Sequence, residues 1–376
     1  MPKPHSVMFI AGDPSGDHHA AAIIQKLSTL DPQLRMWGIG GPTMTSKGFS
    51  SVMPFAPFNK MGFVEVIRHL PFFLGAKKEL ISKIKSDRPD ALVCVDYPGF
   101  NMIMLKEARK LGIPVIWYIA PMVWAWKRKR AEVLGNLASH IAVIFPFEES
   151  YFSQYKAPVT FVGNPLIEAM LSDQSMPVSK KQFPSGEIRL ALIPGSRTQE
   201  IKHMLDPMLQ TAEILQKEYP GIKVTISQFS GLDKSLFSSA DSFTSFSRFK
   251  GPLRELLRNS DLALATSGTA CLEAALMGIP TVIAYKTSTL TYSIFKHLIK
   301  IPYIGLPNII ADRSLLPECI QNEANPQNMA GKLREFLTPH RYEKTVSELN
   351  TLSRYLSDRS PSKQVAEIIY SYLGRS

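Results

Sequence analysis

Short apolar runs alternate with longer amphipathic stretches along most of this chain. Residues 6–11, 92–95 and 262–265 are almost wholly apolar, which is typical of strands buried in a parallel sheet. The stretches at about 18–30 and 199–217 read as helices. Strands that alternate with helices in this way predict an α/β fold built around parallel sheets.

The pattern forms two successive strand–helix series. A polar stretch containing Pro177 and Pro184 separates them, and 376 residues exceed what one hydrophobic core normally holds. We therefore expect two Rossmann-like, doubly wound domains facing across a cleft, at 1–168 and 186–345, and a helical tail at 346–376 that packs on the first domain. The predicted strands are residues 6–11, 36–39, 92–95, 115–118, 141–144, 160–162, 188–193, 223–227 and 262–265.

The chain carries a formal net charge of +11, which indicates an anionic partner such as phosphorylated small molecules, an acidic membrane or nucleic acid. The one dense basic run is residues 127–130, so nucleic acid is not expected. Cys94, Cys271 and Cys319 form no Cys-x-x-Cys pair and suit a reducing compartment. No window reaches the ~18 apolar residues of a membrane span, so we expect a cytoplasmic protein, soluble or peripheral to a membrane.

Ser267, Gly268 and Thr269 stand between a buried strand and a helix. Backbone N–H groups at such a junction can bind phosphate, helped by the helix dipole. Glu273, about one turn into the helix, is placed to reach a ribose diol. The alternative is a capped helix with a surface glutamate.

A second junction of the same kind follows the strand at 188–193. Gly195 permits close backbone approach, Ser196 offers a hydroxyl and Arg197 can fork onto a diphosphate. An ordinary turn with a solvent-facing arginine is the alternative. Two such turns in one domain favour a nucleoside diphosphate.

Asp96 comes directly after the strand at 92–95, at the edge of the sheet where α/β enzymes hold catalytic groups. There it can act as a general base toward a hydroxyl; the alternative, which position alone slightly favours, is helix capping by Asp96 or Asn101. The loop at residues 12–17 lacks the Walker lysine and the Gly-x-Gly-x-x-Gly pattern; it either lines the cleft or caps a helix. Without zinc-type histidine spacing or an Asp-x-Asp pair, no metal site is expected.

Aromatic and basic residues are mixed in two segments, at about 55–78 and 285–303. This mixture is typical of a surface that enters an anionic bilayer or receives acyl chains, and packing in the core is the alternative. The residues expected to make membrane or acyl contact are Phe58, Phe63, Phe72, Phe73, Leu74 and Lys77.

An ordered set of short motifs resembles the lipid-A-disaccharide synthases and covers most of the chain. These motifs are AGDPSGD (11–17), GIGGPTM (38–44), MGFVEV (61–66), DYPGFN (96–101), PMVWAW (121–126), FVGNP (161–165), PGSR (194–197), SGTACLE (267–273) and LPN (306–308).

The resemblance implies an inverting glycosyltransferase of the two-domain GT-B type that acts in lipid A biosynthesis. It would condense UDP-2,3-diacylglucosamine with 2,3-diacylglucosamine 1-phosphate, giving the β-1,6-linked disaccharide 1-phosphate and UDP without a cofactor. The enzyme would be peripheral to the cytoplasmic face of a Gram-negative inner membrane. In this family's fold the terminal helix returns to the N-terminal domain or is exchanged in a homodimer.

The resemblance also assigns roles to residues. Asp96 would be the base, with Asp13, Asp17 and Glu65 as alternatives that also reach the cleft. The residues expected to line the acceptor side are Ser15, Gly16, Asp17 and Glu65. Those expected to bind UDP are Ser196, Arg197, Ser267, Gly268, Thr269, Glu273 and Asn308.

Two other functions remain open on the sequence. A UDP-sugar 2-epimerase shares the paired domains and the Ser-Gly…Glu helix, but it needs neither an acceptor nor a lipid surface. A non-catalytic protein that binds lipid or nucleotide at a membrane needs no base at Asp96.

Overall fold

The computed structural model describes residues 5–59, 70–122, 128–172, 182–229, 231–288 and 302–374. Contacts divide the chain into two compact units, one of residues 1–165 with 359–376 and one of residues 166–358. The chain therefore enters the second unit once and returns to the first at Arg359. This return lies later in the chain than residue 346, where the sequence places the start of the tail.

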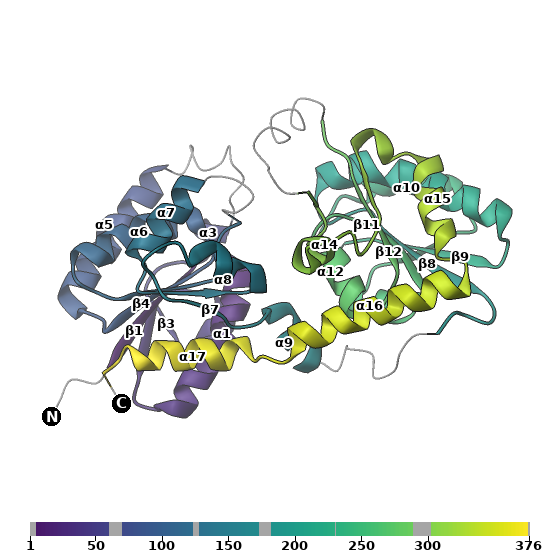
Figure 1. Ribbon diagram of the computed structural model, residues 1–376. Helices are drawn as coiled ribbons and strands as arrows, with labels where there is room; N and C mark the ends of the chain where they lie inside the picture. Colours follow the sequence, from purple (N-terminus) through teal and green to yellow (C-terminus); the bar gives the residue numbers. More distant parts are fainter. Residues whose placement is uncertain are drawn as a thin grey trace. The chain divides into compact units, whose positions relative to one another are not determined.

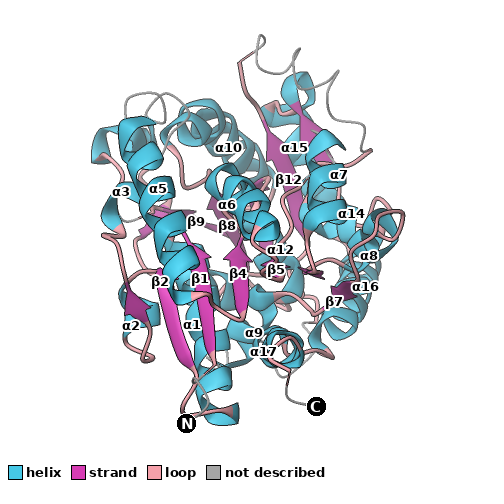
Figure 2. Ribbon diagram, turned by 90° about the vertical axis from the view of Figure 1, so that its left-hand side faces the viewer, coloured by secondary structure: helices cyan, strands magenta, loops and turns pink. Residues whose placement is uncertain are grey.

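The N-terminal unit contains a seven-stranded sheet in the order β3-β2-β1-β4-β5-β6-β7, and every neighbouring pair is parallel. Figure 2 shows the central strands β2, β1 and β4 side by side. β1 and β4 are buried along their whole length, as continuous apolar runs require. The strands are β1 Ser6–Ala11, β2 Arg35–Ile39, β3 Ser50–Ser51, β4 Ala91–Val95, β5 Val115–Tyr118, β6 His140–Val143 and β7 Val159–Phe161.

Helices cover both faces of this sheet (Figure 1). α1 and α17 pack together on one face, and their apolar side chains join those of β1 and β4 in one core. The opposite face carries α5, α6 and α7. The helices are α1 Pro14–Leu30, α2 Pro42–Thr45, α3 Ala56–Asn59, α5 Leu70–Asp87, α6 Pro98–Lys110, α7 Arg128–Leu137, α8 Pro146–Phe152 and α17 Pro361–Ser371.

The first helix begins earlier than the sequence pattern predicts. We expected a loop at residues 12–17 and a helix from about residue 18, but α1 begins at Pro14. Asp13 is the N-cap, and its Oδ1 accepts a hydrogen bond from the Gly16 N–H at 2.7 Å. Proline at the first helical position and aspartate at the cap are a favoured helix start, so most of the motif is the first turn of a helix.

The C-terminal unit repeats the architecture with a six-stranded parallel sheet in the order β10-β9-β8-β11-β12-β13. The strands are β8 Ile188–Ile193, β9 Ile222–Ser227, β10 Ser247–Phe249, β11 Leu262–Thr266, β12 Thr281–Tyr285 and β13 Glu318–Ile320. Two parallel sheets flanked by helices confirm the predicted α/β fold of two doubly wound domains.

α10 and α15 pack together on this second sheet, while α12 contacts α14 and α16 (Figure 1). α16 is the last helix of this unit. The helices are α9 Pro165–Ser172, α10 Thr198–Glu218, α11 Leu253–Arg258, α12 Thr269–Leu276, α14 Leu306–Ala311, α15 Pro326–Glu335 and α16 Pro339–Ser357, with 3₁₀ turns η1 Lys234–Ser242 and η2 Gln321–Glu323.

The packing of α17 leads to a stability prediction. Ile369 is fully buried in the core shared with α1, so Ile369→Ala should cost the N-terminal unit about 2–5 kcal/mol. All the tryptophans, at positions 37, 117, 124 and 126, belong to this unit, so tryptophan fluorescence during urea unfolding follows it selectively. Glu367→Ala, on the exposed side of the same helix, is the control. Equal midpoints for both variants would show that α17 does not support this core.

Candidate active site

In the N-terminal unit, two of the expected site segments emerge from neighbouring strands. Ala11 at the end of β1 pairs with Val95 at the end of β4, so Asp13 and Asp96 follow aligned strand ends. The Asp96 N–H donates to the Tyr118 carbonyl at 2.9 Å, which extends the ladder toward β5. The shared carboxyl edge therefore brings these two acidic residues into one neighbourhood.

Asp96 and Tyr97 both have left-handed backbone conformations, with φ of 43° and 50°. Each such residue costs on the order of 1–3 kcal/mol and persists only where the surroundings enforce it. Tyr97 also precedes Pro98, a position where helical conformations are disfavoured. Strain at a strand end is common at functional sites, which supports Asp96 as a site residue.

The environment raises the pKa of the Asp96 carboxyl to about 6. Burial is the main cause, because it penalises the charged form, and the negative charge of Asp13 adds to it. A backbone hydrogen bond from Tyr97 acts in the opposite direction. A carboxyl with a pKa near neutrality can accept a proton and release it again, as a general base must.

The Asp17 carboxylate is bound by backbone N–H groups of the N-terminal unit. Its side chain is buried, and its two oxygens accept hydrogen bonds from the Gly41, Thr43 and Met44 N–H groups at 2.8, 3.0 and 3.0 Å. These bonds hold the start of α2. Backbone donors thus occupy the carboxylate, and the expectation that Asp17 contacts the acceptor or serves as a base stays a prediction that these bonds do not favour.

Two of the other residues expected on the acceptor side, Ser15 and Gly16, lie in the first turn of α1. The Ser15 hydroxyl is exposed and lies 3.1 Å from Nε2 of His19, while Gly16 is buried in the first turn of α1. Both stay candidates. Glu65 lies outside the described residues.

In the C-terminal unit, both expected phosphate loops leave the same edge of the sheet. Ala265 on β11 pairs with Ile193 on β8, so the turn after each strand begins at the same level. The Ser267 N–H donates to the Ala284 carbonyl at 3.1 Å, and its hydroxyl donates to the Ile304 carbonyl at 2.8 Å. The Ser267 side chain thus holds the loop together, while Gly268 and Thr269 are exposed at the start of α12.

In the loop after β8, backbone N–H groups already bind a carboxylate of the protein, that of Glu200. Oε2 of Glu200 accepts hydrogen bonds from the Ser196 and Arg197 N–H groups at 2.9 and 3.2 Å. Its Oε1 pairs with the Arg197 guanidinium at 2.9 Å. Gly195 has φ of +117°, and a β-carbon there would lie 2.5 Å from Oε2 of Glu200. Arg197 itself is 81% exposed, so its guanidinium is accessible to a ligand.

Glu273 is paired with an arginine that sequence reasoning missed. Nε of Arg254, on α11, lies 3.2 Å from Oε2 of Glu273. Both side chains are mostly buried, so the pair fixes the carboxylate beside the phosphate loop. No motif includes Arg254. It lies 19 residues before Glu273 in the sequence, and only the packing of α11 against α12 brings the two side chains together.

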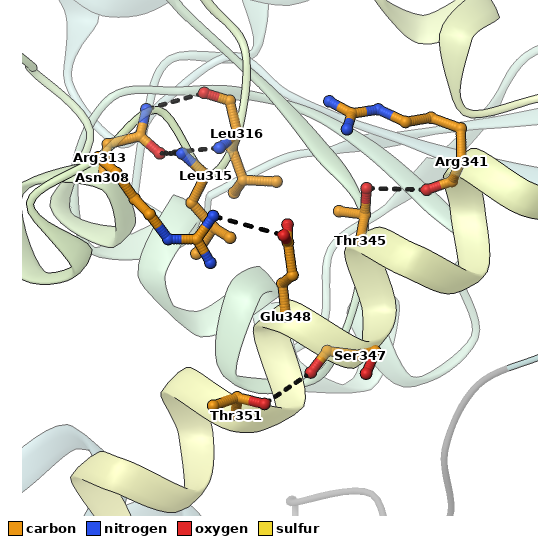
Figure 3. Close-up of polar contacts among 9 residues, drawn as sticks. All are labelled: Asn308, Arg313, Leu315, Leu316, Arg341, Thr345, Ser347, Glu348 and Thr351. Atoms are coloured by element: carbon orange, nitrogen blue, oxygen red, sulfur yellow. Dashed lines mark hydrogen bonds and ion pairs between the residues drawn. The ribbon is translucent and has the colours of Figure 1, made fainter.

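Asn308, expected to bind the donor, has its side-chain amide bonded within the C-terminal unit, so direct donor contact stays a prediction that this geometry does not favour. Its side chain is 0% exposed. Oδ1 accepts from the Leu315 and Leu316 N–H groups at 2.9 and 2.8 Å, and Nδ2 donates to the Leu316 carbonyl and to Glu318 at 2.8 and 2.7 Å. Figure 3 shows the amide turned toward the backbone of 315–316. Asn308 therefore shapes the chain after α14, and nearby Arg313 pairs with Glu348 of α16 at 3.4 Å.

Phe58 lies in the interior of the N-terminal unit and not at the surface, so its expected membrane contact stays a prediction that this burial does not favour. It is 1% exposed, and its ring packs edge-on against Phe72, Phe73, Tyr97 and Phe100 at 5.1–6.5 Å between centroids.

The rest of the expected lipid-contact set lies on α5, apart from Phe63, which is outside the described residues. Phe72 and Phe73 are half-buried, whereas Leu74 is 59% exposed. Lys77 pairs with Glu107 at 3.3 Å. A shallow groove on α5 is lined by Leu74, Lys77, Lys78, Ile81, Ser82 and Lys85.

Across the described ranges, no cluster of histidine, cysteine and carboxylate side chains has the arrangement of a metal site. Within the same ranges, no helix is long and apolar enough to cross a bilayer.

Comparison with known proteins decides the family. The model of the lipid-A-disaccharide synthetase family matches residues 7–369. The lipid-A-disaccharide synthase of Geobacter sulfurreducens is 35% identical over 376 residues, which cover 99% of this chain and 98% of the relative. The chain belongs to the lipid-A-disaccharide synthetase family. The resemblance drawn from the motifs is confirmed, and with it the expectation of a glycosyltransferase.

Solved structures of distant proteins share the fold of this chain. The UDP-GlcNAc 2-epimerase of Neisseria meningitidis, bound to UDP-GlcNAc, gives a TM-score of 0.60 at 13% identity and covers 98% of this chain and 99% of its own. CalG4, the calicheamicin glycosyltransferase, gives a TM-score of 0.61 at 13% identity, with 99% of each chain covered. At these identities the likeness shows the shared two-domain fold alone, so the epimerase is a neighbour in fold only.

Among the residues that sequence reasoning passed over in this synthetase, Glu200 had a detectable signal. A glutamate three residues after a helix cap commonly accepts the N–H of the cap residue, and Glu200 does so at Arg197. The sequence suggests Asn101 only as a helix cap. In the structure its side chain donates to three backbone carbonyls.

The raised pKa of Asp96 leads to a prediction on stability. The pKa of Asp96 in the folded protein, about 6, lies above the value of 3.8 for an unperturbed aspartate. The protonated carboxyl therefore contributes to the free energy of unfolding an amount that is fully present below pH 3.8 and is lost as the pH rises through 6. Asp96→Asn keeps a side chain that tolerates the left-handed region and removes this loss. Relative to the wild type, the variant should gain about 2 kcal/mol between pH 4 and pH 7.5.

Urea unfolding followed by tryptophan fluorescence at each pH measures this difference. Asp90→Asn, in the same unit, is the control for loss of a carboxylate. If the stability difference between Asp96→Asn and the wild type stays constant over this pH range, the carboxyl is not held in an unfavourable charged state.

Proposed function

We propose that this chain condenses UDP-2,3-diacylglucosamine with 2,3-diacylglucosamine 1-phosphate to give the β-1,6-linked disaccharide 1-phosphate and UDP. The family match over residues 7–369 carries this proposal. It is supported by a base candidate of suitable pKa on the N-terminal unit and by two phosphate loops on the C-terminal unit.

The donor chemistry belongs to the C-terminal unit. The N–H groups at the start of α10 and α12 and the exposed Arg197 would bind the diphosphate, and Glu273, held by Arg254, would bind the ribose diol. As the bond from the anomeric carbon to the diphosphate breaks, negative charge develops on the leaving oxygen. Fixed donors at that point stabilise this charge most in the transition state.

The acceptor chemistry belongs to the N-terminal unit. The 6-hydroxyl oxygen attacks the anomeric carbon from the face opposite UDP, its proton passes to the Asp96 carboxylate, and UDP departs with the bonding pair. A single displacement of this kind inverts the configuration at the anomeric carbon. A carboxyl with a pKa of about 6 is ionised at neutral pH and is still basic enough to assist the attack.

The exposed part of α5 would meet the lipid phase. Leu74 is exposed beside Lys78 and Lys85, and the half-buried Phe72 and Phe73 precede it. A protruding apolar side chain next to lysines suits an anionic membrane surface, which attracts each cation by about 1 kcal/mol. Location at the cytoplasmic face of the inner membrane follows from this proposal, and a homodimer stays a prediction of the resemblance.

A coupled assay of UDP release, with the diacylated donor and with or without the monosaccharide phosphate acceptor, tests the reaction. Release should require both substrates and should rise with pH up to about 6. Asp96→Asn should lower kcat by about 10²–10⁴-fold because it removes the base, while UDP binding by calorimetry stays unchanged.

Other outcomes identify the alternatives. Turnover of UDP-N-acetylglucosamine alone would indicate an epimerase. No turnover by the wild type, together with retained UDP binding, would indicate a non-catalytic protein. Wild-type kcat in Asp96→Asn would leave the family intact and remove Asp96 as the base.

Membrane contact is tested by sedimentation with vesicles of phosphatidylglycerol and of phosphatidylcholine. Lys78→Gln combined with Lys85→Gln should weaken binding to the anionic vesicles by about 30-fold, the equivalent of about 2 kcal/mol, and should leave the neutral vesicles unaffected. Lys202→Gln with Lys344→Gln removes the same charge from exposed positions of the other unit. If both double variants lose the same affinity for the anionic vesicles, the net charge of the protein causes the binding and α5 is not a specific contact.

A further inference from the structure

The turn that carries Asp96 requires something to hold it. Asp96 and Tyr97 are consecutive non-glycine residues in the left-handed region, and Tyr97 adopts φ 50° and ψ 53° directly before Pro98. A free chain leaves this conformation readily, because the extended region is favoured for both residues. The geometry of the Asp96 carboxylate therefore depends on groups that fix the turn.

Asn101 is placed to fix it. The side chain lies on α6, is 0% exposed, and donates from Nδ2 to the Asp96 carbonyl at 2.7 Å. The same nitrogen lies 3.3 Å from the carbonyls of Val95 and Ile10. Its backbone N–H donates to the Tyr97 carbonyl at 3.2 Å. One residue thus holds both peptides of the strained turn and joins them to the ends of β4 and β1.

We propose that Asn101 is a positioning residue for glycosyl transfer, whose buried amide holds the Asp96–Tyr97 turn so that the carboxylate stays aligned with the acceptor hydroxyl. This inference rests on the proposed function, in which Asp96 is the base. Asn101 acts on the reaction through Asp96 and touches neither substrate.

A second contact holds the same turn from the other side. The Tyr97 ring lies over Gly12, where a β-carbon would come within 2.5 Å of it, and its hydroxyl donates to the Phe58 carbonyl at 3.0 Å. Gly12 directly precedes Asp13, whose charge contributes to the raised pKa of Asp96. The turn is thus clamped between the amide of Asn101 and the glycine at the end of β1.

The competing explanation is that Asn101 only stabilises the N-terminal unit. Loss of stability alone lowers the amount of active protein, but it does not change the pH dependence of the molecules that remain folded. Loss of alignment lowers kcat in folded protein and releases the carboxylate to solvent. The groups that set the pKa of this carboxyl, besides burial, are Asp13 and the Tyr97 N–H.

The test compares Asn101→Ala with Ile369→Ala, which weakens the core of the same unit far along the chain from the turn. With saturating substrates, Asn101→Ala should lower kcat by about 10²-fold, the loss expected from a misplacement of about 1 Å. The rise of its kcat with pH, which we call the acidic limb, should have its midpoint below pH 6, while UDP affinity stays within twofold of the wild type. Ile369→Ala should keep both the limb and the kcat of folded protein.

Two more variants keep the test decisive if Asn101→Ala folds poorly. Asn101→Ser retains one donor and should show an intermediate loss. Gly12→Ala displaces the Tyr97 ring and should reproduce the lower kcat and the shifted limb with Asn101 intact. The proposal is overturned if the folded variants keep the wild-type limb, or if kcat falls no further than in Ile369→Ala. Absence of UDP release by the wild type would instead contradict the proposed function.

Discussion

Parallel pairing of the two central strands in each unit is the constraint on which the candidate site depends. In the N-terminal unit Ala11 pairs with Val95, and in the C-terminal unit Ile193 pairs with Ala265. Because parallel strands end at the same edge, each ladder fixes the separation of two loops before any side chain contributes. A register slip of one residue would separate Asp13 from Asp96 and would turn every apolar side chain of the strand to the opposite face.

Much of the fold was predictable because buried strands leave a strong sequence signal. The runs at β1, β5 and β8 were placed with the right bounds or nearly so, since each is almost wholly apolar. Strands β3, β10, β12 and β13 were missed. The edge strands β3, β10 and β13 have only two or three residues each and carry no apolar run. The buried strand β12 follows the apolar helix α12 so closely that the sequence does not separate the two elements.

The sequence predicts where the candidate site residues lie in the fold, but it does not predict which groups their side chains bind. Residues next to strand ends, such as Asp96 and Arg197, follow from the ladder alone. The partners of Asp17 and Asn308 were not predictable, because a buried polar side chain and a ligand-binding one look the same in sequence, and only the fold shows the backbone groups that they bind. No motif reveals that the Glu200 carboxylate occupies the Ser196 and Arg197 N–H groups. In the proposed function, a phosphate that binds these groups would have to displace this tethered carboxylate.

The return of the chain at Arg359 has a consequence for the order in which the protein is made. α17 supplies Val365, Ile369 and Leu373 to the core of the N-terminal unit, yet these residues are synthesised after the whole C-terminal unit. The C-terminal unit is complete at Asp358, whereas until then the sheet that carries Asp96 has only α1, without α17, on one face. The N-terminal unit, which the ribosome begins first, is therefore completed only after the C-terminal unit, and a nascent chain exposes part of this apolar face until α17 has been synthesised.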